Sequence, residues 1–166
     1  MKALQRISGF PPVEREDATL LVLGSMPSEE SLRQGQYYGH PKNQFWRIVP
    51  TVLGFPVGLP YERRLEELRC RQVALWDVVM TCRRKGSLDA NIKEEIPNDL
   101  EGFLRSHAQI RRIVLNGQTA ASLFRRYLKG VDLSGIESIT LPSTSPACAM
   151  LTYERKLELW RSALLS

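Results

Sequence analysis

The chain alternates short apolar runs with longer stretches in which apolar residues recur every three or four positions. Short runs that end at glycine, aspartate, asparagine or proline are typical of strands buried in a parallel sheet. Four segments fit this description: residues 18–23, 73–76, 110–115 and 137–141. Because parallel strands need long crossovers between them, this order predicts repeated strand–helix–strand units.

Helical spacing occurs between and after these strands. Residues 153–165 give the clearest case, because Tyr153, Leu157, Trp160 and Leu164 fall on one face of a helix. The other predicted helices are residues 43–53, 61–70, 99–107 and 118–128.

Two segments interrupt the regular order. Pro50 lies inside the predicted helix 43–53 and removes a backbone donor, so we expect that helix to bend or to stop before Gly54. Residues 81–97 are polar and predict a loop with one helical turn near residues 91–94. Together, the elements predict a three-layer α/β/α sandwich around a central, mainly parallel sheet of four strands.

Composition limits the class of protein. The chain has 166 residues, 43% of them hydrophobic, which suits one domain spanning residues 1–166. A formal net charge of +5 favours an anionic partner. Cys70, Cys82 and Cys148 are widely spaced, so we interpret them as reduced thiols and expect no metal site. Without a signal-peptide pattern or a membrane-spanning apolar run, we expect a cytoplasmic or nucleoid-associated monomer that is neither secreted nor membrane-bound.

Ligand sites of such sheets lie beyond the carboxyl ends of the strands. The residues at these positions are Gly24-Ser25-Met26-Pro27-Ser28, Asp77, Asn116-Gly117 and Pro142-Ser143-Thr144-Ser145-Pro146. Each group alone is compatible with an ordinary connector. Their joint position at one edge of a single sheet favours a shared site.

Residues 36–46, with the sequence QYYGHPKNQFW, contain more special side chains than core packing requires. Aromatic faces can stack on a planar base, a polar side chain can hold a water or a base edge, and proline fixes the backbone between them. This density predicts a site. We interpret Phe45 and Trp46 as core residues, because they begin the helical stripe.

Five blocks occur in order along the chain. They are GSMPS (24–28), QYYGHPKNQFW (36–46), WDVVMTCRRKGSLDANI (76–92), LNG (115–117) and LPSTSPA (141–147). Together they resemble the uracil-DNA glycosylase superfamily, most closely its hypoxanthine-DNA glycosylase branch and less closely the mismatch-specific uracil glycosylases. The resemblance runs from about residue 21 to the C-terminal helix and implies a four-stranded parallel sheet flanked by helices.

The resemblance implies a DNA repair enzyme that hydrolyses the N-glycosidic bond of a deaminated base flipped out of DNA. Hypoxanthine is the expected base, and uracil and xanthine are alternatives. The partner is then DNA containing a damaged base, and neither a metal nor another cofactor is required. Such an enzyme must stabilise charge on the departing base and deliver water to the far side of the sugar.

The first loop departs from the better-known branches of the superfamily. They place an Asp or Asn there to position the water, whereas Ser25 and Met26 occur here, and LPSTSPA lacks the histidine that they often carry. In the hypoxanthine branch the functional asparagine resembles Asn43. An amide can orient water and form hydrogen bonds as charge develops, so Asn43 is the expected catalytic residue. Its alternative role is a helix N-cap, and the two roles are compatible.

The resemblance also implies a base pocket. Tyr38 stands where the mismatch-specific relatives place an aromatic residue that stacks on the flipped base, and the alternative is a core tyrosine. Asp77 is a second candidate, although a carboxylate facing an anionic base needs a proton or a donor edge. Asn116 either reads the base edge or satisfies the end of its strand. The remaining candidates come from the first loop: Gly24, Ser25 and Met26.

Contacts to the DNA backbone are expected from two segments. Ser143, Thr144 and Ser145 offer hydroxyls and backbone amides to a phosphate, and we expect Pro146, followed by Ala147, to enter the space that the flipped nucleotide leaves. His40 is either structural or a phosphate contact. Lys42 is a predicted backbone contact, and further basic candidates, with solvated surface as the alternative, are Arg47, Arg83, Arg84 and Lys85.

Two other classes of function fit part of the pattern. A nucleic-acid-binding module without catalysis would explain the charge and the aromatic residues, but it would not need Asn43 beside a pocket tyrosine. A small-molecule N-glycoside hydrolase would use the same sheet edge. The chain contains neither a Gly-rich phosphate motif, GxGxxG or GxxxxGK[ST], nor a GxSxG elbow.

Overall fold

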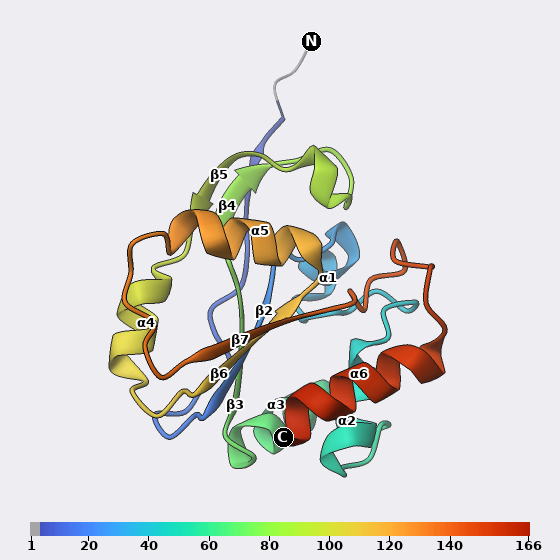
Figure 1. Cartoon of the computed structure of the whole chain (residues 1–166). Coiled ribbons are helices and arrows are strands. Elements are labelled where there is room, and N and C mark those ends of the chain that lie inside the picture. Colours follow the sequence, from blue (N-terminus) through green and yellow to red (C-terminus); the bar gives the residue numbers. More distant parts are fainter. Residues whose placement is uncertain (1–3) are drawn as a thin grey trace.

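A four-stranded parallel sheet forms the centre of the computed structural model, which describes residues 4–166 (Figure 1). Its strands are β2 (Leu20–Gly24), β3 (Val73–Asp77), β6 (Arg112–Asn116) and β7 (Glu137–Leu141), in the order β3-β2-β6-β7. All their pairings are parallel, and the predicted strands are confirmed. Residues 1–3, part of the predicted domain 1–166, lie outside the described residues.

Helices cover both faces of this sheet (Figure 1). One face carries α2 (Phe45–Leu53), α3 (Tyr61–Cys70) and α6 (Tyr153–Leu165), and the other carries α4 (Leu100–Ser106) and α5 (Gln118–Tyr127). Along β2, Leu20 and Val22 pack in the first apolar core, whereas Leu21 and Leu23 pack in the second. This alternation follows the two-residue period of a strand. The predicted three-layer α/β/α fold is therefore confirmed.

Helix α2 contains Pro50 without stopping at it. The helix continues to Leu53 and ends where Gly54 adopts a φ of +87° and donates its N–H to the Pro50 carbonyl at 2.8 Å. The expected end before Gly54 is observed, but its cause is the left-handed glycine cap rather than the proline.

A second sheet, which is antiparallel, contradicts the prediction for residues 81–97. It consists of β1 (Arg6–Ser8), β4 (Val79–Arg83) and β5 (Lys93–Pro97), in the order β1-β4-β5. The predicted loop thus begins and ends in strands, at residues 81–83 and 93–97, and its helical turn lies at Asp89–Asn91 rather than at residues 91–94. Strand β5 escaped prediction because it is mostly polar, and β4 because its five residues are too few to show the apolar alternation that marks a strand in sequence.

A short helix that the sequence did not predict, α1 (Glu29–Gln34), follows the first loop. Ser28 is its N-cap, and Gly35 ends it in the left-handed conformation. Among residues 4–166, no helix is both long enough and apolar enough to cross a bilayer.

Candidate active site

The carboxyl ends of β2 and β3 bring two predicted residues together. Gly24 and Asp77 are register partners at the last positions of these strands. A side-chain carbon added to Gly24 would lie 2.5 Å from Asp77 Oδ1 and 3.0 Å from the hydroxyl oxygen of Tyr38. Only glycine leaves room for both groups, so its missing side chain creates the space in which they meet.

Asp77 is a buried carboxyl group whose surroundings favour the neutral form. The residue is 4% exposed, and its Oδ2 has no hydrogen-bond partner among the described residues. Burial, followed by the negative charge of Asp89, raises the pKa of Asp77 to about 7, against the opposing effects of Arg84 and the backbone of Gly24. Near neutral pH this carboxyl group can therefore act either as a donor or as an acceptor.

Tyr38 combines a strained backbone with a partly enclosed ring. Its φ of +53° lies in the left-handed region, at a cost on the order of 1–3 kcal/mol for such a residue. The ring stacks on Phe45, with centroids 4.1 Å apart and planes inclined by 18°. Burial raises the pKa of the Tyr38 hydroxyl. The amide of Asn116 is near this hydroxyl but does not meet hydrogen-bond geometry, so the hydroxyl has no hydrogen-bond partner among the described residues.

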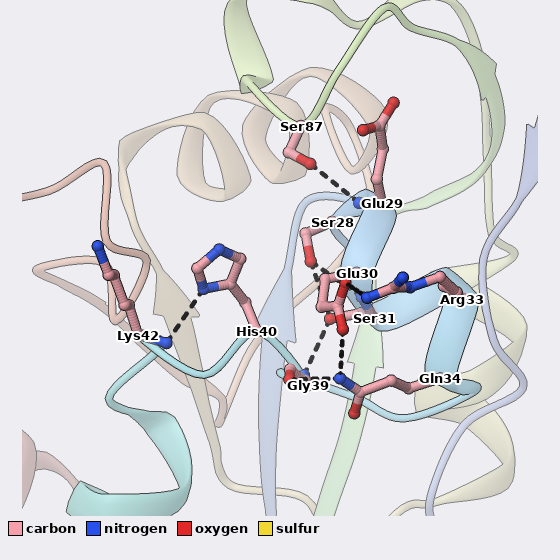
Figure 2. Close-up of polar contacts among 10 residues, drawn as sticks. All are labelled: Ser28, Glu29, Glu30, Ser31, Arg33, Gln34, Gly39, His40, Lys42 and Ser87. Atoms are coloured by element: carbon pink, nitrogen blue, oxygen red, sulfur yellow. Dashed lines mark hydrogen bonds and ion pairs between the residues drawn. The ribbon is translucent and has the colours of Figure 1, made fainter.

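Helix α1 holds the loop that carries Tyr38 (Figure 2). Ser31 Oγ accepts the N–H of Gly39 at 2.9 Å, and Gln34 Nε2 donates to the Gly39 carbonyl at 3.1 Å. Ser31 is bonded in turn to the N-cap residue Ser28. The unpredicted helix thus fixes the backbone immediately after the strained tyrosine.

His40 and Pro41 shape the turn that leads to Asn43. The Asn43 N–H donates to the His40 carbonyl at 2.9 Å, and Pro41 occupies the turn position that favours its fixed φ. His40 Nδ1 accepts the N–H of Lys42 at 3.0 Å, which places the proton of the neutral ring on Nε2 (Figure 2). Lys42 is exposed and His40 is half-buried. The Lys42 ammonium group and the His40 Nε2–H can therefore donate to a ligand outside the loop.

Asn43 lies one residue before Gln44, the N-cap of α2, and nevertheless accepts a backbone N–H of the helix start as a capping side chain would. Its Oδ1 accepts the N–H of Phe45, the first residue of α2, at 2.9 Å. This bond leaves the amide NH₂ group and one lone pair of Oδ1 for a further partner. The neighbouring Gln44 has a buried Oε1 without a partner among the described residues, and sequence reasoning missed it.

Large aromatic residues behind the loop belong to the core. Phe45 is fully buried and Trp46 is 8% exposed, which confirms their interpretation as core residues. The Tyr37 hydroxyl donates to the Pro11 carbonyl at 2.8 Å, and the Tyr37 carbonyl accepts the Trp46 indole N–H at 2.7 Å. Tyr37 therefore anchors the loop, while Tyr38 is the tyrosine beside Gly24 and Asp77.

Asn116 joins the end of β6 to the loop after β7. Its Nδ2 donates to Thr144 Oγ1 and its Oδ1 accepts the Thr144 N–H, both at 3.0 Å. The Thr144 carbonyl accepts the N–H of Gln44 at 3.0 Å. Thr144 itself has no exposed surface. This burial revises the expectation for Thr144, because it could contact DNA only if the loop moved. Thr144 instead links the β7–α6 loop to the start of α2.

The remainder of that loop reaches the surface. The Ser145 N–H donates to Ser143 Oγ at 3.0 Å, both serines are half-buried, and Pro146 is exposed. Further along the loop, Met150 is 95% exposed, more than any other large apolar residue described.

The connection between β4 and β5 forms a wall beside the first loop. Ser25 Oγ donates to Asp89 Oδ1 at 2.7 Å, and Arg84 Nη2 donates to the Pro27 carbonyl at 2.6 Å. Arg84 is 5% exposed, so it is neither solvated surface nor a free backbone contact, contrary to both expectations. Met26 packs in the apolar core beneath α4 and α5. In the sequence, the block of residues 76–92 indicated that this segment matters, but it did not predict which of its residues would be buried against the first loop.

Four buried side-chain atoms lack a hydrogen-bond partner among the described residues, and all come from segments that meet at this sheet edge. They are Tyr38 Oη, Gln44 Oε1, Asp77 Oδ2 and Arg84 Nη1. Buried polar atoms are normally paired, so a cluster of unpaired ones indicates a place for a ligand or water. Of these groups, the Asp77 carboxyl and the Tyr38 hydroxyl meet at Gly24, and a donor and an acceptor beside an aromatic ring suit a flat polar ligand.

Two cavities lie elsewhere. One of about 640 Å³ opens at the amino ends of the strands, where Thr19, Val73, Arg112 and Glu137 contribute to its wall. Its three arginines, Arg71, Arg111 and Arg112, already bond to carbonyl or carboxylate oxygens. The other, about 490 Å³, lies between the β4–β5 connection and α5, with Asp89 in its wall. Only the second adjoins the site.

Comparison with known proteins identifies the family of the chain and agrees with its fold. The family model of the uracil DNA glycosylase superfamily matches residues 11–164. A hypoxanthine DNA glycosylase of Methanosarcina acetivorans is 38% identical over 90% of this chain and 93% of its own. Its counterpart from Methanosarcina barkeri is 38% identical over 84% of this chain and 86% of its own.

A solved structure supports the same assignment. The solution NMR structure of a Methanosarcina acetivorans protein, described as a candidate uracil DNA glycosylase, superposes with a TM-score of 0.83 at 35% identity. The match covers 96% of this chain and 97% of that one. The fold thus defines an α/β/α protein built on a parallel sheet, with the candidate ligand site at the carboxyl edge of that sheet. The chain belongs to the uracil DNA glycosylase superfamily, whose members are DNA glycosylases.

Proposed function

We propose that this protein removes a deaminated base, hypoxanthine first, from DNA. Two relatives at 38% identity bear the name of that activity. The observation that carries the proposal is the convergence of Asp77 and Tyr38 at Gly24, each with a buried polar atom that has no partner among the described residues. A flipped base is a flat heterocycle with donors and acceptors on its edge, and it would satisfy these atoms.

The reaction requires one water molecule. Its oxygen bonds to C1′ of the deoxyribose as the bond between C1′ and the base nitrogen breaks. The electron pair of that bond leaves with the base. The water gives up one proton and the base takes one up, so that OH is added to C1′ and H to the base. The protein must therefore hold a water beyond C1′ and stabilise negative charge on the base.

Asn43 is the proposed holder of the water. Its bond to the Phe45 N–H fixes the side chain at the start of α2, and its NH₂ group and second Oδ1 lone pair are left for the water. Capping and catalysis thus use different parts of one amide. Gln44, whose buried Oε1 has no partner, is the neighbouring group that would compete for the same water.

Tyr38 and Asp77 are the proposed contacts to the base. Phe45 covers one face of the Tyr38 ring, so a base would stack on the other face. In its neutral form Asp77 would donate to an oxygen or nitrogen of the departing base and avoid the repulsion that a carboxylate would cause. The other proposed pocket residues are Gly24, Ser25, Met26 and Asn116.

Backbone contacts would come from the two loops that flank the site. We assign them to the Nε2–H of His40, to Lys42 and to the Ser143–Pro146 segment, in which Thr144 supports the loop from inside. The exposed Met150 lies in the same connection as Pro146 and is a second candidate for the gap that the flipped nucleotide leaves. Hydroxyl, amide and ammonium contacts to phosphates position DNA without reading its sequence.

A base-release assay tests the proposal. Oligonucleotides with a single hypoxanthine, uracil or xanthine, in single and double strands, would be incubated with the protein and analysed for abasic sites. We expect abasic product, with hypoxanthine released fastest. Binding without product would instead support the nucleic-acid-binding module, and cleavage only of free nucleosides would support the small-molecule hydrolase.

A further inference from the structure

Three charged side chains meet where the β4–β5 connection packs against the first loop. Asp77 is buried beside Gly24, and Arg84 is buried against the Pro27 carbonyl. Asp89 accepts the hydroxyl of Ser25, the residue that follows Gly24. This bond places Asp89 beside the first loop, and Gly24 of the same loop is the register partner of Asp77, so the negative charge of Asp89 acts on Asp77.

Arg84 is positioned by carbonyl groups rather than by a carboxylate. Its Nε and Nη2 donate to the carbonyls of Gly86 and Pro27 at 2.8 and 2.6 Å. Its Nη1 is buried without a partner, and within residues 4–166 it forms no ion pair. A single guanidinium charge thus acts on both Asp77 and Asp89 from a fixed place.

The charges of this group determine where a proton resides. With both carboxyl groups ionised, the three side chains sum to one negative charge beside a base that becomes negative as it departs. Retaining one proton removes that excess charge. Burial raises the pKa of Asp89 as well, but the hydroxyl of Ser25 donates to its carboxylate and favours its ionised form. Asp77 is enclosed and its Oδ2 has no donor, so the proton belongs on Asp77.

We propose that Asp89 is a positioning residue that acts across Ser25 to keep a proton on Asp77, so that Asp77 donates a hydrogen bond to the departing base. Arg84 opposes this effect and limits it, because its positive charge favours the ionised form of Asp77. The inference rests on the proposed function only for the role of the base. The coupling between the two carboxyl groups is a property of the protein without substrate.

The other groups that face Asp77 do not supply this control. Tyr37 and Tyr38 come from the neighbouring loop, and burial raises the pKa of both hydroxyls, so they stay neutral. The backbone of Gly24 contributes a fixed hydrogen bond, and Asn98 donates to the backbone carbonyl of Asp77 rather than to its carboxyl group. Arg84 and Asp89 are therefore the charged residues that set the protonation of Asp77.

Two substitutions with opposite expected signs test the inference. In Asp89→Asn the loss of a negative charge lowers the pKa of Asp77, by roughly 0.5–1 pH unit for a screened interaction across a partly buried site. In Arg84→Gln the loss of a positive charge raises it. The pKa of Asp77 would be measured without DNA, from the pH dependence of its side-chain carboxyl carbon signal in NMR spectra, assigned with Asp77→Asn.

Matched controls separate charge from structure. Glu95→Gln removes a negative charge from the wall of the same neighbouring cavity without contacting Ser25, and we expect the Asp77 pKa to stay at its original value. Arg84→Lys keeps the charge but cannot reproduce both carbonyl bonds, and should also leave that pKa nearly unchanged. Folding of Arg84→Gln would be verified by thermal unfolding, and Asp89→Asn provides the test if that variant does not fold.

Base release then connects the coupling to function. Release should decline as pH rises through the pKa of Asp77, and in Asp89→Asn this decline should shift to lower pH by the same interval as the NMR titration. An unchanged Asp77 pKa in Asp89→Asn overturns the inference, and so does a shifted pKa with an unshifted decline. If no base is released from any oligonucleotide, the proposed function fails, and the NMR titration still decides whether the two carboxyl groups are coupled.

Discussion

Asp77 and Tyr38 are residues that a protein selected only for stability would avoid. Asp77 places a carboxyl group where water cannot reach it, and Tyr38 holds a left-handed backbone conformation that favours glycine. Strain and unpaired polar atoms of this kind concentrate at functional sites, where surrounding structure maintains them. The bond from Ser31 to Gly39 and the stacking of Phe45 provide that support for Tyr38.

The buried carboxyl group makes stability depend on pH. Because the pKa of Asp77 is about 7 in the folded protein and near 3.8 when unfolded, the folded state holds the proton between these values and the unfolded state does not. Stability therefore falls as pH rises from about 4 to about 7 and then levels off, with a cost of roughly 4 kcal/mol at most.

Asp77→Asn should remove this cost. We expect its free energy of unfolding, relative to the original protein, to increase between about pH 5 and about pH 8, measured by urea denaturation at both values. Asp132→Asn is the control, since its neighbour Ser134 lowers the pKa of that exposed carboxyl group and no gain at high pH should follow. A difference between Asp77→Asn and the original protein that is constant with pH would contradict the raised pKa.

At the scale of elements, β2 ends in Gly24, whose missing side chain lets Asp77 and Tyr38 approach each other at the candidate site. Gly24→Ala would place a carbon 2.5 Å from Asp77 Oδ1 and 3.0 Å from the Tyr38 hydroxyl, so one of them must move. We expect a loss of base release of at least about 100-fold, as for removal of an oriented hydrogen-bonding group. A change in stability should accompany it, because Asp77 is enclosed.

Gly58→Ala is the matched control for this substitution. No atom lies within 4 Å of a side-chain carbon at Gly58, so release and stability should both remain close to those of the original protein. Near-normal release by a folded Gly24→Ala protein would show that the space beside Gly24 is not the base pocket.

The sequence predicted the elements that carry strong periodicity. The four parallel strands and helices such as α6 bury regular apolar faces, and their positions in the sequence were recognisable for that reason. It also placed Gly24 and Asp77 correctly at strand ends, which parallel pairing brings into register.

The rest depended on contacts between distant segments. Strands β4 and β5 have five residues each, β5 is mostly polar, and α1 has six residues, so none has a distinctive period. Nothing local distinguishes Arg84 from the adjacent basic residues Arg83 and Lys85. It is buried because the β4–β5 connection folds over Pro27, 57 positions earlier in the chain. The pairing of Asn116 with Thr144 is equally invisible in sequence, since each residue alone is an ordinary strand-end residue.

At the scale of the whole molecule, the site lies at one edge where both sheets and three loops converge. The parallel sheet supplies Gly24, Asp77 and Asn116 from its carboxyl ends, and the antiparallel sheet holds the β4–β5 connection against them. The loop after β7 is joined to the start of α2 through Thr144. Asn43 lies at this start of α2, where its Oδ1 accepts the N–H of Phe45.

The most direct test of the central claim compares Asn43→Ala and Asn43→Ser on a duplex with one hypoxanthine. Serine can still cap α2 but has no amide to hold the water, whereas alanine loses both functions and about 1 kcal/mol of stability. We predict that single-turnover release falls by at least about 100-fold in both variants, while DNA binding and, for Asn43→Ser, thermal stability are retained. Near-normal release by Asn43→Ser would show that Asn43 only caps the helix and would contradict its role in positioning the water.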